Sequence, residues 1–157
     1  TVQNNTFVGY GATPFDFGCE GGWDFCQNAA STYQNNLFMG YSDPLYNDGA
    51  LPGLFYEEGS TIPPNQGWAT RNHNIFYNTR EGYCPTPLQA GETCTEDPLF
   101  ISEPASPISA ESDLDGFNFK PSSSSPAAGA GIAIPGLTTD YNGTTRPNPP
   151  SIGALEP

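Results

Sequence analysis

The chain has 157 residues, which is the usual size of one domain. Four Lys and Arg residues stand against 17 Asp and Glu residues, and this net charge of −13 excludes the basic surface that nucleic acids require and disfavours anionic lipids. The chain contains 18 Gly and 17 Pro residues and no long segment with the apolar period of a helix, so the composition predicts an all-β, turn-rich fold.

A short motif near the start of the chain returns along the sequence. Residues 4–10 read Asn-Asn-Thr-Phe-Val-Gly-Tyr, and residues 35–41 read Asn-Asn-Leu-Phe-Met-Gly-Tyr. Residues 73–78 carry a looser copy, His-Asn-Ile-Phe-Tyr-Asn, and residues 97–101 carry a shorter echo, Asp-Pro-Leu-Phe-Ile. A motif that returns at intervals of roughly 20–50 residues indicates a repeat architecture.

The residues around each repeated Phe predict one coil of a solenoid. Phe7, Phe38 and Phe76 alternate with neighbours that would point outward, and this period of two is typical of a strand. Asn tolerates the left-handed backbone region, so each Asn-Asn pair suits a tight bend between two short strands. We therefore expect the Phe rings to stack inside the solenoid and the Asn amides to form hydrogen bonds from coil to coil.

Three long excursions interrupt the coils that we expect over residues 1–101. They span residues 11–31, 42–67 and 79–96. Loops of this length are usually functional or form contacts. The aromatic residues of the excursions have two interpretations: they pack over the coils as satellite cores, or they contact a glycan or another subunit. The candidates for such contacts are Trp23, Tyr46, Phe55, Tyr56 and Trp68.

The four cysteines fall into two local pairs. Their even number, the low Lys content and the surrounding Gly/Pro-rich loops predict disulfides in an oxidising compartment. The expected pairs are Cys19 with Cys26 and Cys84 with Cys94. Neither pair has the spacing of a zinc finger, so we expect no metal at the thiols. We accordingly expect the protein outside the cell or at the cell surface.

Two sequons are present in the chain. They are Asn4-Asn5-Thr6 and Asn142-Gly143-Thr144, which makes Asn4 and Asn142 the expected glycosylation sites. The chain opens on Thr1 without an apolar run, which indicates a processed form or a fragment. No apolar stretch has the length of a transmembrane helix.

The chain changes character after residue 101. Residues 102–131 are rich in Ser, Pro and Ala, and residues 132–157 are punctuated by Gly and Pro. Because the ends of a solenoid need a covering, we expect residues 102–157 to form a C-terminal cap wrapped on the last coil. Within this cap we expect an ion pair between Arg146 and Asp140.

Nearly the whole chain resembles a known family, most strongly from residue 97 onward. The motifs that carry this resemblance follow in order: Asp97-Pro98-Leu99-Phe100, Phe117-Asn118-Phe119-Lys120-Pro121, Ser125-Pro126-Ala127, Thr138-Thr139-Asp140-Tyr141-Asn142-Gly143, Arg146-Pro147 and Ile152-Gly153-Ala154-Leu155-Glu156. This order resembles the C-terminal end of secreted, pectate-lyase-like parallel β-helix proteins. The resemblance implies an all-β fold: a short right-handed parallel β-helix with long disulfide-stapled loops and a C-terminal cap. Gly129 and Ser151 depart from the family pattern, which has acidic residues there.

The resemblance leaves the reaction open, because parallel β-helix proteins include lyases, epimerases, adhesins and fibres. A polysaccharide lyase needs a base, commonly Lys or Arg, beside carboxylates that hold calcium. Arg71 and His73 are the candidates, and they would share a face if one strand ran through both, with Glu81 near them. The stronger interpretation makes Arg71 a surface charge and places His73 in the Asn position of the corner. We therefore predict no catalytic residue.

We expect no cofactor, although the sequence leaves calcium binding open. Residues 113–116, Asp-Leu-Asp-Gly, resemble a fragment of a calcium loop but lack the further ligands and the terminal Glu of an EF-hand. Carboxylates within residues 43–58 are a second candidate for calcium.

Our leading hypothesis is a secreted, non-enzymatic structural or adhesive subunit that assembles end to end into a filament. Its basis is the repeat at the very start of the chain, which would leave a first coil with unpaired backbone groups and the apolar Phe7 uncovered. The alternatives are a C-terminal fragment of a carbohydrate-active, polysaccharide lyase-like β-helix enzyme and a glycan-binding module. We expect self-association, a possible role for glycans, no nucleic-acid partner and no membrane insertion.

Overall fold

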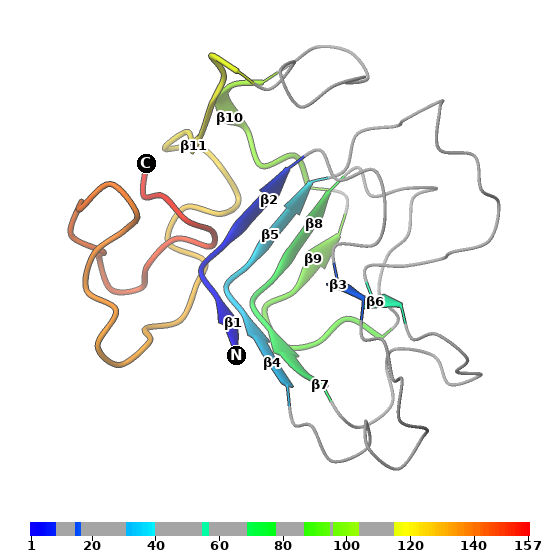
Figure 1. Cartoon of the computed structure of the whole chain (residues 1–157). Coiled ribbons are helices and arrows are strands. Elements are labelled where there is room, and N and C mark those ends of the chain that lie inside the picture. The colour runs from blue at the N-terminus through cyan, green and yellow to red at the C-terminus, as the bar shows by residue number, and fades with distance from the viewer. Residues whose placement is uncertain are drawn as a thin grey trace, which may run out of the picture.

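The structure is a computed structural model that describes eight ranges of the chain (Figure 1). These ranges are residues 1–8, 15–16, 31–39, 55–56, 69–77, 87–94, 96–103 and 115–157. Every regular element within them is a strand. The described ranges contain no helix that could span a lipid bilayer. The all-β fold predicted from the composition is confirmed for this part of the chain.

Two parallel sheets form the body of the fold. The strand order in one sheet is β1 (Val2–Gln3), β4 (Ser31–Gln34) and β7 (Ala69–Asn72). The strand order in the other is β2 (Thr6–Val8), β5 (Leu37–Met39), β8 (Ile75–Tyr77) and β9 (Thr93–Cys94). All pairings in both sheets are parallel. The stacked strands therefore have a β-helix-like arrangement.

The chain is stacked in layers, each of which contributes one strand to each sheet. We call residues 1–8, 31–39 and 69–77 the first, second and third layers. The bend between the two strands of a layer lies at Asn4, Asn35 and His73, whose φ angles are 53°, 56° and 51°. These are left-handed backbone conformations, which Asn and His adopt more readily than most residues. The predicted role of the Asn-Asn pair as a bend is confirmed, and His73 takes the Asn position in the third layer.

The repeated phenylalanines stack on one another inside the fold. The rings of Phe7 and Phe38 have centroids 5.1 Å apart, and those of Phe38 and Phe76 have centroids 5.3 Å apart. In each pair the two ring planes are inclined to one another by only 5°. The pairing register brings the three residues into line. This confirms the register predicted from the repeat.

The fourth strand of the β2 sheet differs from the prediction. Cys94, in β9, is the register partner of Phe76. Phe100 instead begins β10 (Phe100–Ser102), which pairs antiparallel with β11 (Asn118–Pro121), and its ring meets Phe119 edge-on at 5.4 Å. The expectation that residues 97–101 repeat the coil is wrong, because Cys94 takes the register position beside Phe76 and β10 pairs antiparallel with β11.

Short strands also occur inside the ranges expected as excursions. β3 (Phe15–Asp16) pairs parallel with β6 (Phe55–Tyr56), and β9 falls within residues 79–96. The side chains of β3 and β6 lie outside the description. The boundaries of the coils, excursions and cap remain predictions.

The residues that follow β11, which we call the C-terminal segment, cover the outer flank of the β2 sheet. One buried cluster joins strand residues to this segment: Leu37, Met39, Ile75, Phe100, Ala127 and Ile152. Since Phe38 and Phe76 stack on the opposite side of the strands, β5 and β8 bury apolar side chains on both faces. In Figure 1 the orange and red segment accordingly lies beside β2.

The expected position of the cap on the last coil is wrong for this segment. The backbone N–H of Gly153 donates to Asn35 O (2.8 Å), and that of Ala154 donates to Thr6 Oγ1 (2.9 Å). The N–H of Ile132 donates to Asn35 Oδ1 (3.0 Å). The segment thus runs along the first and second layers, where burial of Ile152 on the flank stabilises it.

Gly153→Ala is expected to lower the free energy of unfolding by roughly 2–4 kcal/mol. Gly153 has a φ of +99°, and a Cβ there would lie 2.7 Å from Thr6 Oγ1. Urea denaturation measures the change. Gly143→Ala is the matched control, because Gly143 has a φ of +85° and no atom within 4 Å of its Cβ position. Equal losses in both variants would contradict the close packing of Gly153 on the first layer.

Candidate functional site

A row of Asn side chains, which we call the Asn ladder, connects the layers at their bends. It consists of Asn5, Asn36 and Asn74, and the last two are fully buried. Asn5 Nδ2 donates to Asn36 Oδ1 (3.2 Å), and Asn36 Nδ2 donates to Asn74 Oδ1 (3.1 Å). The backbone N–H groups of Asn5 and Asn36 donate to the same two oxygens at 3.1 and 2.9 Å. The predicted hydrogen bonds from coil to coil are confirmed, and they have a direction: each Asn donates towards the next layer.

The other Nδ2–H of each ladder residue reaches a backbone carbonyl. Asn36 donates to Val2 O (2.9 Å) and Asn74 donates to Tyr33 O (3.1 Å), in each case in the preceding layer. Val2 and Tyr33 are register partners, so these two bonds are equivalent. Asn5 donates instead to a carbonyl of its own layer, at 2.9 Å. In the described part of the chain, Asn5 has no preceding layer to reach.

A second amide row runs parallel to the ladder. Gln3 Nε2 donates to Gln34 Oε1 (3.0 Å), and Gln34 Nε2 donates to Asn72 Oδ1 (2.8 Å). In both rows the hydrogen bonds between side-chain amides therefore run from donors in the first layer towards acceptors in the third. At the first layer, no donor among the described residues reaches Gln3 Oε1 or Asn5 Oδ1. The outer edges of β1 and β2 likewise pair with no described strand. The first layer thus presents backbone edges and two amide oxygens that accept hydrogen bonds.

The opposite end of the ladder stops at a carboxylate. Asn74 Nδ2 donates to Glu92 Oε1 (2.9 Å), and the Gln89 N–H donates to Glu92 Oε2 (2.8 Å). Arg71 forms an ion pair with Glu92, through Nε and Nη2 at 3.3 Å each. Both residues are buried, each with 7% of its surface exposed. An ionised carboxylate only accepts hydrogen bonds, so Glu92 ends the row of donors.

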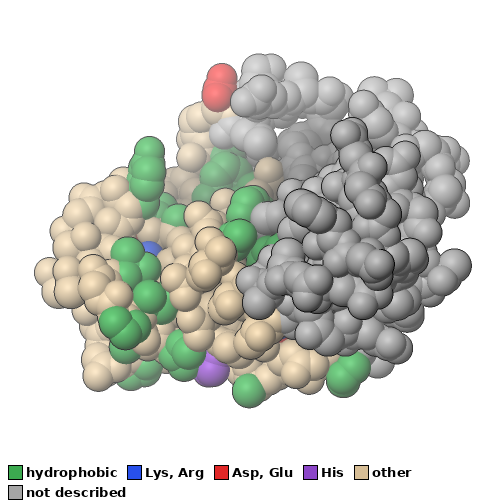
Figure 2. All heavy atoms as spheres, turned by 60° about the horizontal axis from the view of Figure 1, so that its bottom comes forward, with side chains coloured by type: hydrophobic (Ala, Val, Ile, Leu, Met, Phe, Trp, Pro, Cys, Tyr) green, Lys and Arg blue, Asp and Glu red, His purple; other side chains and the backbone are tan. Residues whose placement is uncertain are grey.

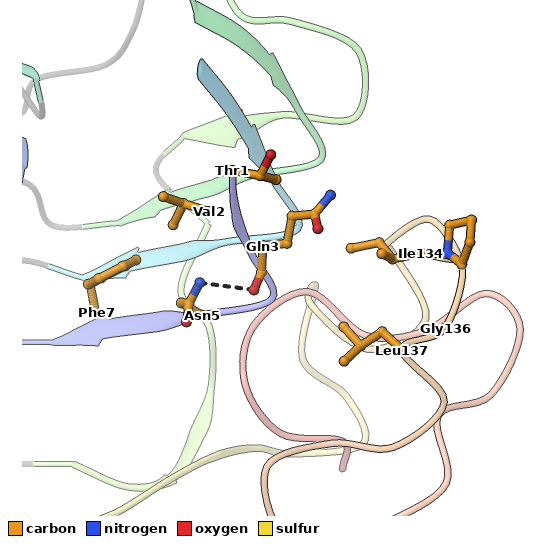
Figure 3. A pocket seen from close by; sticks show the side chains of 9 residues that line it. Thr1, Val2, Gln3, Asn5, Phe7, Ile134, Gly136 and Leu137 are labelled. Carbon is orange, nitrogen blue, oxygen red and sulfur yellow. Dashed lines mark hydrogen bonds between the residues drawn. The ribbon is translucent and has the colours of Figure 1, made fainter. Parts of the chain in front are cut away.

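A groove of about 700 Å³ lies against the first layer (Figure 3). The first layer and a turn of the C-terminal segment line it, through Thr1, Val2, Gln3, Asn5, Phe7, Ile134, Pro135, Gly136 and Leu137. Figure 3 shows Ile134 and Leu137 facing the strand that carries Gln3. The groove therefore places an apolar wall beside the amide groups of the first layer.

An acidic cluster lies away from this groove, around Tyr77, Asp97 and Glu103. Burial, followed by the charges of Asp97 and Glu103, raises the pKa of Tyr77, whose hydroxyl donates to Asp97 Oδ2 (3.4 Å). Burial and the neighbouring Asp97 raise the pKa of Glu103. The described residues contain no group of three or more His, Cys, Asp and Glu side chains that could hold a metal ion. We assign no ligand to this cluster.

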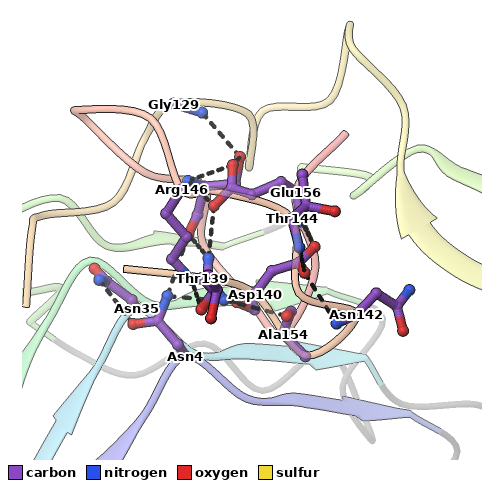
Figure 4. Close-up of polar contacts among 12 residues, drawn as sticks. Asn4, Asn35, Gly129, Thr139, Asp140, Asn142, Thr144, Arg146, Ala154 and Glu156 are labelled. Atoms are coloured by element: carbon purple, nitrogen blue, oxygen red, sulfur yellow. Dashed lines mark hydrogen bonds and ion pairs between the residues drawn. The ribbon is translucent and has the colours of Figure 1, made fainter. Parts of the chain in front are cut away.

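A polar cluster fixes the C-terminal segment (Figure 4). Arg146 Nη1 lies 2.6 Å from Glu156 Oε1, so the ion pair predicted between Arg146 and Asp140 is corrected to Arg146 and Glu156. Arg146 Nη2 also donates to Gly153 O (3.0 Å) and Ala154 O (3.1 Å). Arg146 thereby holds the stretch that packs on the first layer, which is a structural role.

Asp140 is held by backbone groups of the same segment. Its Oδ1 accepts the N–H groups of Asn142 (2.9 Å) and Thr144 (2.7 Å), and its Oδ2 accepts that of Glu156 (3.0 Å). Burial alone would raise the pKa of Asp140. The three N–H donors and the charge of Arg146 outweigh burial and lower that pKa below its ordinary value of 3.8. Hydrogen bonds to the charged form account for this direction.

Asp140→Asn is expected to weaken the loss of stability in acid. Because the folded pKa of Asp140 is lowered, the carboxylate stabilises the fold above pH 3.8, and this contribution is lost as the pH falls from 3.8 through the folded pKa. Melting temperatures measured between about pH 6 and pH 2 should therefore fall less steeply in the variant. Asp115→Asn, at an exposed position, is the control and should keep the slope of the parent. Identical slopes in all three proteins would contradict the role of Asp140.

Many predicted site residues lie outside the described residues. They are Cys19, Cys26, Cys84, Trp23, Tyr46, Trp68, Glu81 and Asp113. Phe55 and Tyr56 form β6, but the remainder of residues 43–58 lies outside the description. Cys94 is disulfide-bonded, and its pairing with Cys84 stays a prediction.

The two sequons lie in different surroundings. Asn142 is exposed, whereas Asn4 is only 7% exposed and its Nδ2 lies 3.5 Å from both Ser151 O and Gly153 O. A glycan on Asn4 Nδ2 would have to displace these contacts. We therefore keep Asn142 alone as a proposed glycosylation site.

Arg71 and His73 do not form a common face on one strand. β7 ends at Asn72, and His73 occupies the bend after it. Arg71 is not the surface charge that we expected, because it is buried in the ion pair with Glu92. His73 Nδ1 lies 3.2 Å from Asn72 Oδ1. Both residues thus have structural contacts at the bends of the stack.

The chain matches no protein-family model and no curated protein sequence. The parallel sheets agree with the β-helix resemblance at the level of fold class. Any function therefore has to be argued from the first layer, its groove and the direction of the amide rows.

Proposed function

We propose that the chain is an extracellular structural subunit that assembles end to end into a filament. In this proposal it forms a short right-handed parallel β-helix with disulfide-stapled loops, and its Asn142 carries a glycan. The observation that carries the proposal is the first layer, whose strand edges and amide oxygens accept further hydrogen bonds. Head-to-tail contacts through such a surface generate an open filament, because successive copies do not close into a ring.

The groove supports this assembly role. Unpaired strand edges of a sheet are ready templates for another chain. Leu137, at the wall of the groove, is 39% exposed and would be covered by a chain that pairs with β1 and β2. Addition of a strand to an edge takes its affinity from backbone hydrogen bonds and its specificity from the pockets for side chains.

The enzymatic alternative has less support among the described residues. A lyase would use Arg71 or His73. Arg71, however, forms an ion pair with the buried carboxylate of Glu92, and His73 forms the bend of the third layer. The glycan-binding alternative depends on Trp23, Tyr46 and Trp68, which lie outside the description. The structural role therefore remains the function that the geometry favours.

Negative-stain electron microscopy and sedimentation velocity of the purified chain test the filament. We expect fibres with an axial repeat of one subunit at neutral pH. Leu137→Asp should shorten or abolish them by placing a charge in the groove, whereas Tyr141→Asp, at a residue that is 87% exposed and does not line the groove, should not. A monodisperse monomer at all concentrations would overturn self-assembly.

A further inference from the structure

A turn of the C-terminal segment holds the single Asn-Gly dipeptide of the sequence, Asn142-Gly143. Both residues are exposed, and the Asn142 side chain makes no hydrogen bond with a described residue. Figure 4 shows this side chain at the edge of the polar cluster, pointing away from Asp140. Because Gly has no side chain, the Gly143 nitrogen is open to the amide carbon of Asn142, Cγ. The dipeptide is therefore a candidate for attack by the backbone on its own side chain.

Hydrogen bonds hold the backbone of this turn. Asp140 Oδ1 accepts the N–H groups of Asn142 (2.9 Å) and Thr144 (2.7 Å). The Gly143 N–H donates to Asp140 O (3.1 Å), and the Asp140 N–H donates to Thr144 O (2.8 Å). The nitrogen beside the Asn142 amide is thus engaged as long as the turn is intact, while the amide itself faces solvent.

We propose that Asn142 deamidates spontaneously in the folded chain wherever it carries no glycan, at a rate that Asp140 controls. The Gly143 nitrogen loses its proton and forms a bond to Asn142 Cγ. The bond from Cγ to Nδ2 breaks, and Nδ2 takes up a proton and leaves as ammonia. Water then opens the resulting succinimide ring at either carbonyl carbon, which yields an aspartyl or an isoaspartyl residue. The reaction consumes only water, and the inference does not depend on the filament.

The folded turn has to open before the ring can form. The Gly143 nitrogen gives up its hydrogen bond to Asp140 O, and the Asn142 backbone rotates to bring this nitrogen onto Cγ. Such a rotation also disturbs the N–H groups that Asp140 Oδ1 accepts. Hydrogen bonds to an ionised carboxylate are stronger than neutral ones, so Asp140 accounts for much of the free energy of opening. The reaction is therefore slower in the folded chain than in the unfolded chain, and its rate reports local opening of the turn.

The two other exposed Asn residues of the described ranges lack this reactivity. Asn148 precedes Pro149, whose nitrogen carries no proton to lose. Asn118 precedes Phe119, whose side chain crowds the approach of the nitrogen, and Asn118 Oδ1 accepts the N–H of Lys120 (3.1 Å). Among the exposed Asn residues of these ranges we therefore expect deamidation at residue 142.

Either product adds a negative charge that the chain can hardly compensate. The new carboxylate joins 17 Asp and Glu residues, against which stand only four Lys and Arg residues. Figure 2 accordingly shows few Lys and Arg side chains on the face of the described part that it displays. Arg146, just beyond the turn, already pairs with Glu156 at 2.6 Å. The new charge therefore adds repulsion with Asp140 rather than a new ion pair.

The isoaspartyl product also lengthens the turn. Its main chain runs through the former side chain, which inserts a further carbon atom before Gly143. The hydrogen bonds of Gly143 and Thr144 to Asp140 then no longer fit. Arg146 holds the end of the C-terminal segment through its bonds to two backbone carbonyls there. A disturbed turn beside Arg146 should loosen this segment, so the isoaspartyl form should melt at a lower temperature than the parent.

Peptide mapping by mass spectrometry tests the reaction on the chain purified without a glycan from a bacterial host. The folded chain and the chain unfolded in guanidinium chloride are incubated at neutral pH. We expect residue 142 to gain the mass that separates a carboxyl group from an amide, about tenfold more slowly in the folded chain than in the unfolded one. Asn142→Gln should remove the signal, because its longer side chain would have to close a larger ring, which forms far more slowly.

Two outcomes of this experiment would overturn the inference. In the first, Asn142 stays intact in the folded chain for many half-lives of the reaction in guanidinium chloride. In the second, Asn118 of the folded chain reacts as fast as Asn142, which would show that the Asn-Gly turn has no special reactivity.

Asp140→Asn tests the control of the rate. The variant weakens the hydrogen bonds to the Asn142 and Thr144 N–H groups, so residue 142 should deamidate about tenfold faster in the folded chain and at the parent's rate in guanidinium chloride. Glu96→Gln, at an exposed position, should change neither rate. Circular dichroism establishes that each variant is folded during the incubation. An unchanged folded rate in Asp140→Asn, or equal folded and unfolded rates in the parent, would overturn the role of Asp140.

Ion-exchange chromatography separates the products and tests their effect on the fold. Asn142→Asp is the matched control, because it carries the new charge without the additional backbone carbon. Its melting temperature should lie between those of the parent and the isoaspartyl form. Equal melting temperatures of Asn142→Asp and the isoaspartyl form would overturn the inferred effect of the lengthened turn.

Discussion

Replacing Glu92 with Gln is expected to lower the free energy of unfolding by about 3–5 kcal/mol. The variant keeps the shape of the side chain but removes the negative charge that lies 3.3 Å from the buried guanidinium of Arg71. Removing one partner of a buried ion pair takes a compensating charge away from the other partner, which costs more than the pair itself contributes. Urea denaturation monitored by circular dichroism measures the loss.

Two further variants make the Glu92 experiment decisive. Glu96→Gln removes a carboxylate of the same type at an exposed position and should change stability by less than about 0.5 kcal/mol. Arg71→Gln combined with Glu92→Gln should recover part of the loss, because both charges of the buried pair are then removed together. A loss below about 1 kcal/mol for Glu92→Gln, or no recovery in the double variant, would show that the ion pair does not hold this end of the stack.

The stack itself could be predicted from the sequence because its signals are local. The left-handed bend depends on the residue type at Asn4 and Asn35, and the inward position of Phe38 depends on the alternation of its neighbours. Once both features recur, parallel pairing in register aligns them, and the structure has this register. No information from distant parts of the chain was needed for these features.

The end of the ladder could not be predicted, because the repeat disappears there. Glu92 precedes β9 as Asn74 precedes β8, but Glu and Cys94 replace the Asn and Phe of the earlier layers. The later Asp-Pro-Leu-Phe motif retains a Phe, and for this reason the fourth copy of the coil was predicted there instead of at β9. The residue that stabilises a buried Glu92 at the end of the ladder is Arg71, which lies in the third layer. Such a long-range ion pair leaves no periodic signal in the sequence.

The sequence of β5 and β8 carries a signal for the position of the C-terminal segment. β5 reads Leu-Phe-Met and β8 reads Ile-Phe-Tyr, so both strands carry apolar or aromatic side chains on both faces. Strands of this kind are covered on both sides. The inner face is occupied by the Phe stack, so the outer face needs another segment, and Ala127 and Ile152 supply it. That pattern predicts a cover along the flank better than a cap at the end.

The direction of the amide rows is a property of the folded stack alone. An Asn side chain carries both a donor and an acceptor, so the amino-acid sequence is compatible with hydrogen bonds between the side-chain amides in either direction. The direction is set by the backbone N–H groups of Asn5 and Asn36, which point to the next layer and require an oxygen there.

Asn36→Ala is expected to lower the free energy of unfolding by roughly 3–5 kcal/mol. Asn36 is fully buried, accepts two hydrogen bonds from Asn5, and donates to Asn74 Oδ1 and Val2 O. The variant leaves several of these partners buried without a hydrogen bond, and each such group costs about 1–3 kcal/mol. Asn142→Ala, at an exposed position, is the control and should change stability by less than about 0.5 kcal/mol.

Asn36→Asp separates the loss of donors from the loss of the acceptor. Its carboxylate keeps an acceptor for Asn5 but has no N–H for Asn74, and it places a charge at a position with 0% exposure. Burial without a cation raises the folded pKa of this Asp above about 3.9, so its destabilisation should shrink as the pH falls through that folded pKa. Asn36→Ala has no titrating group and should show a loss independent of pH relative to the parent. If both variants responded to pH alike, or if Asn36→Ala matched Asn142→Ala, the ladder would not be the connection between layers.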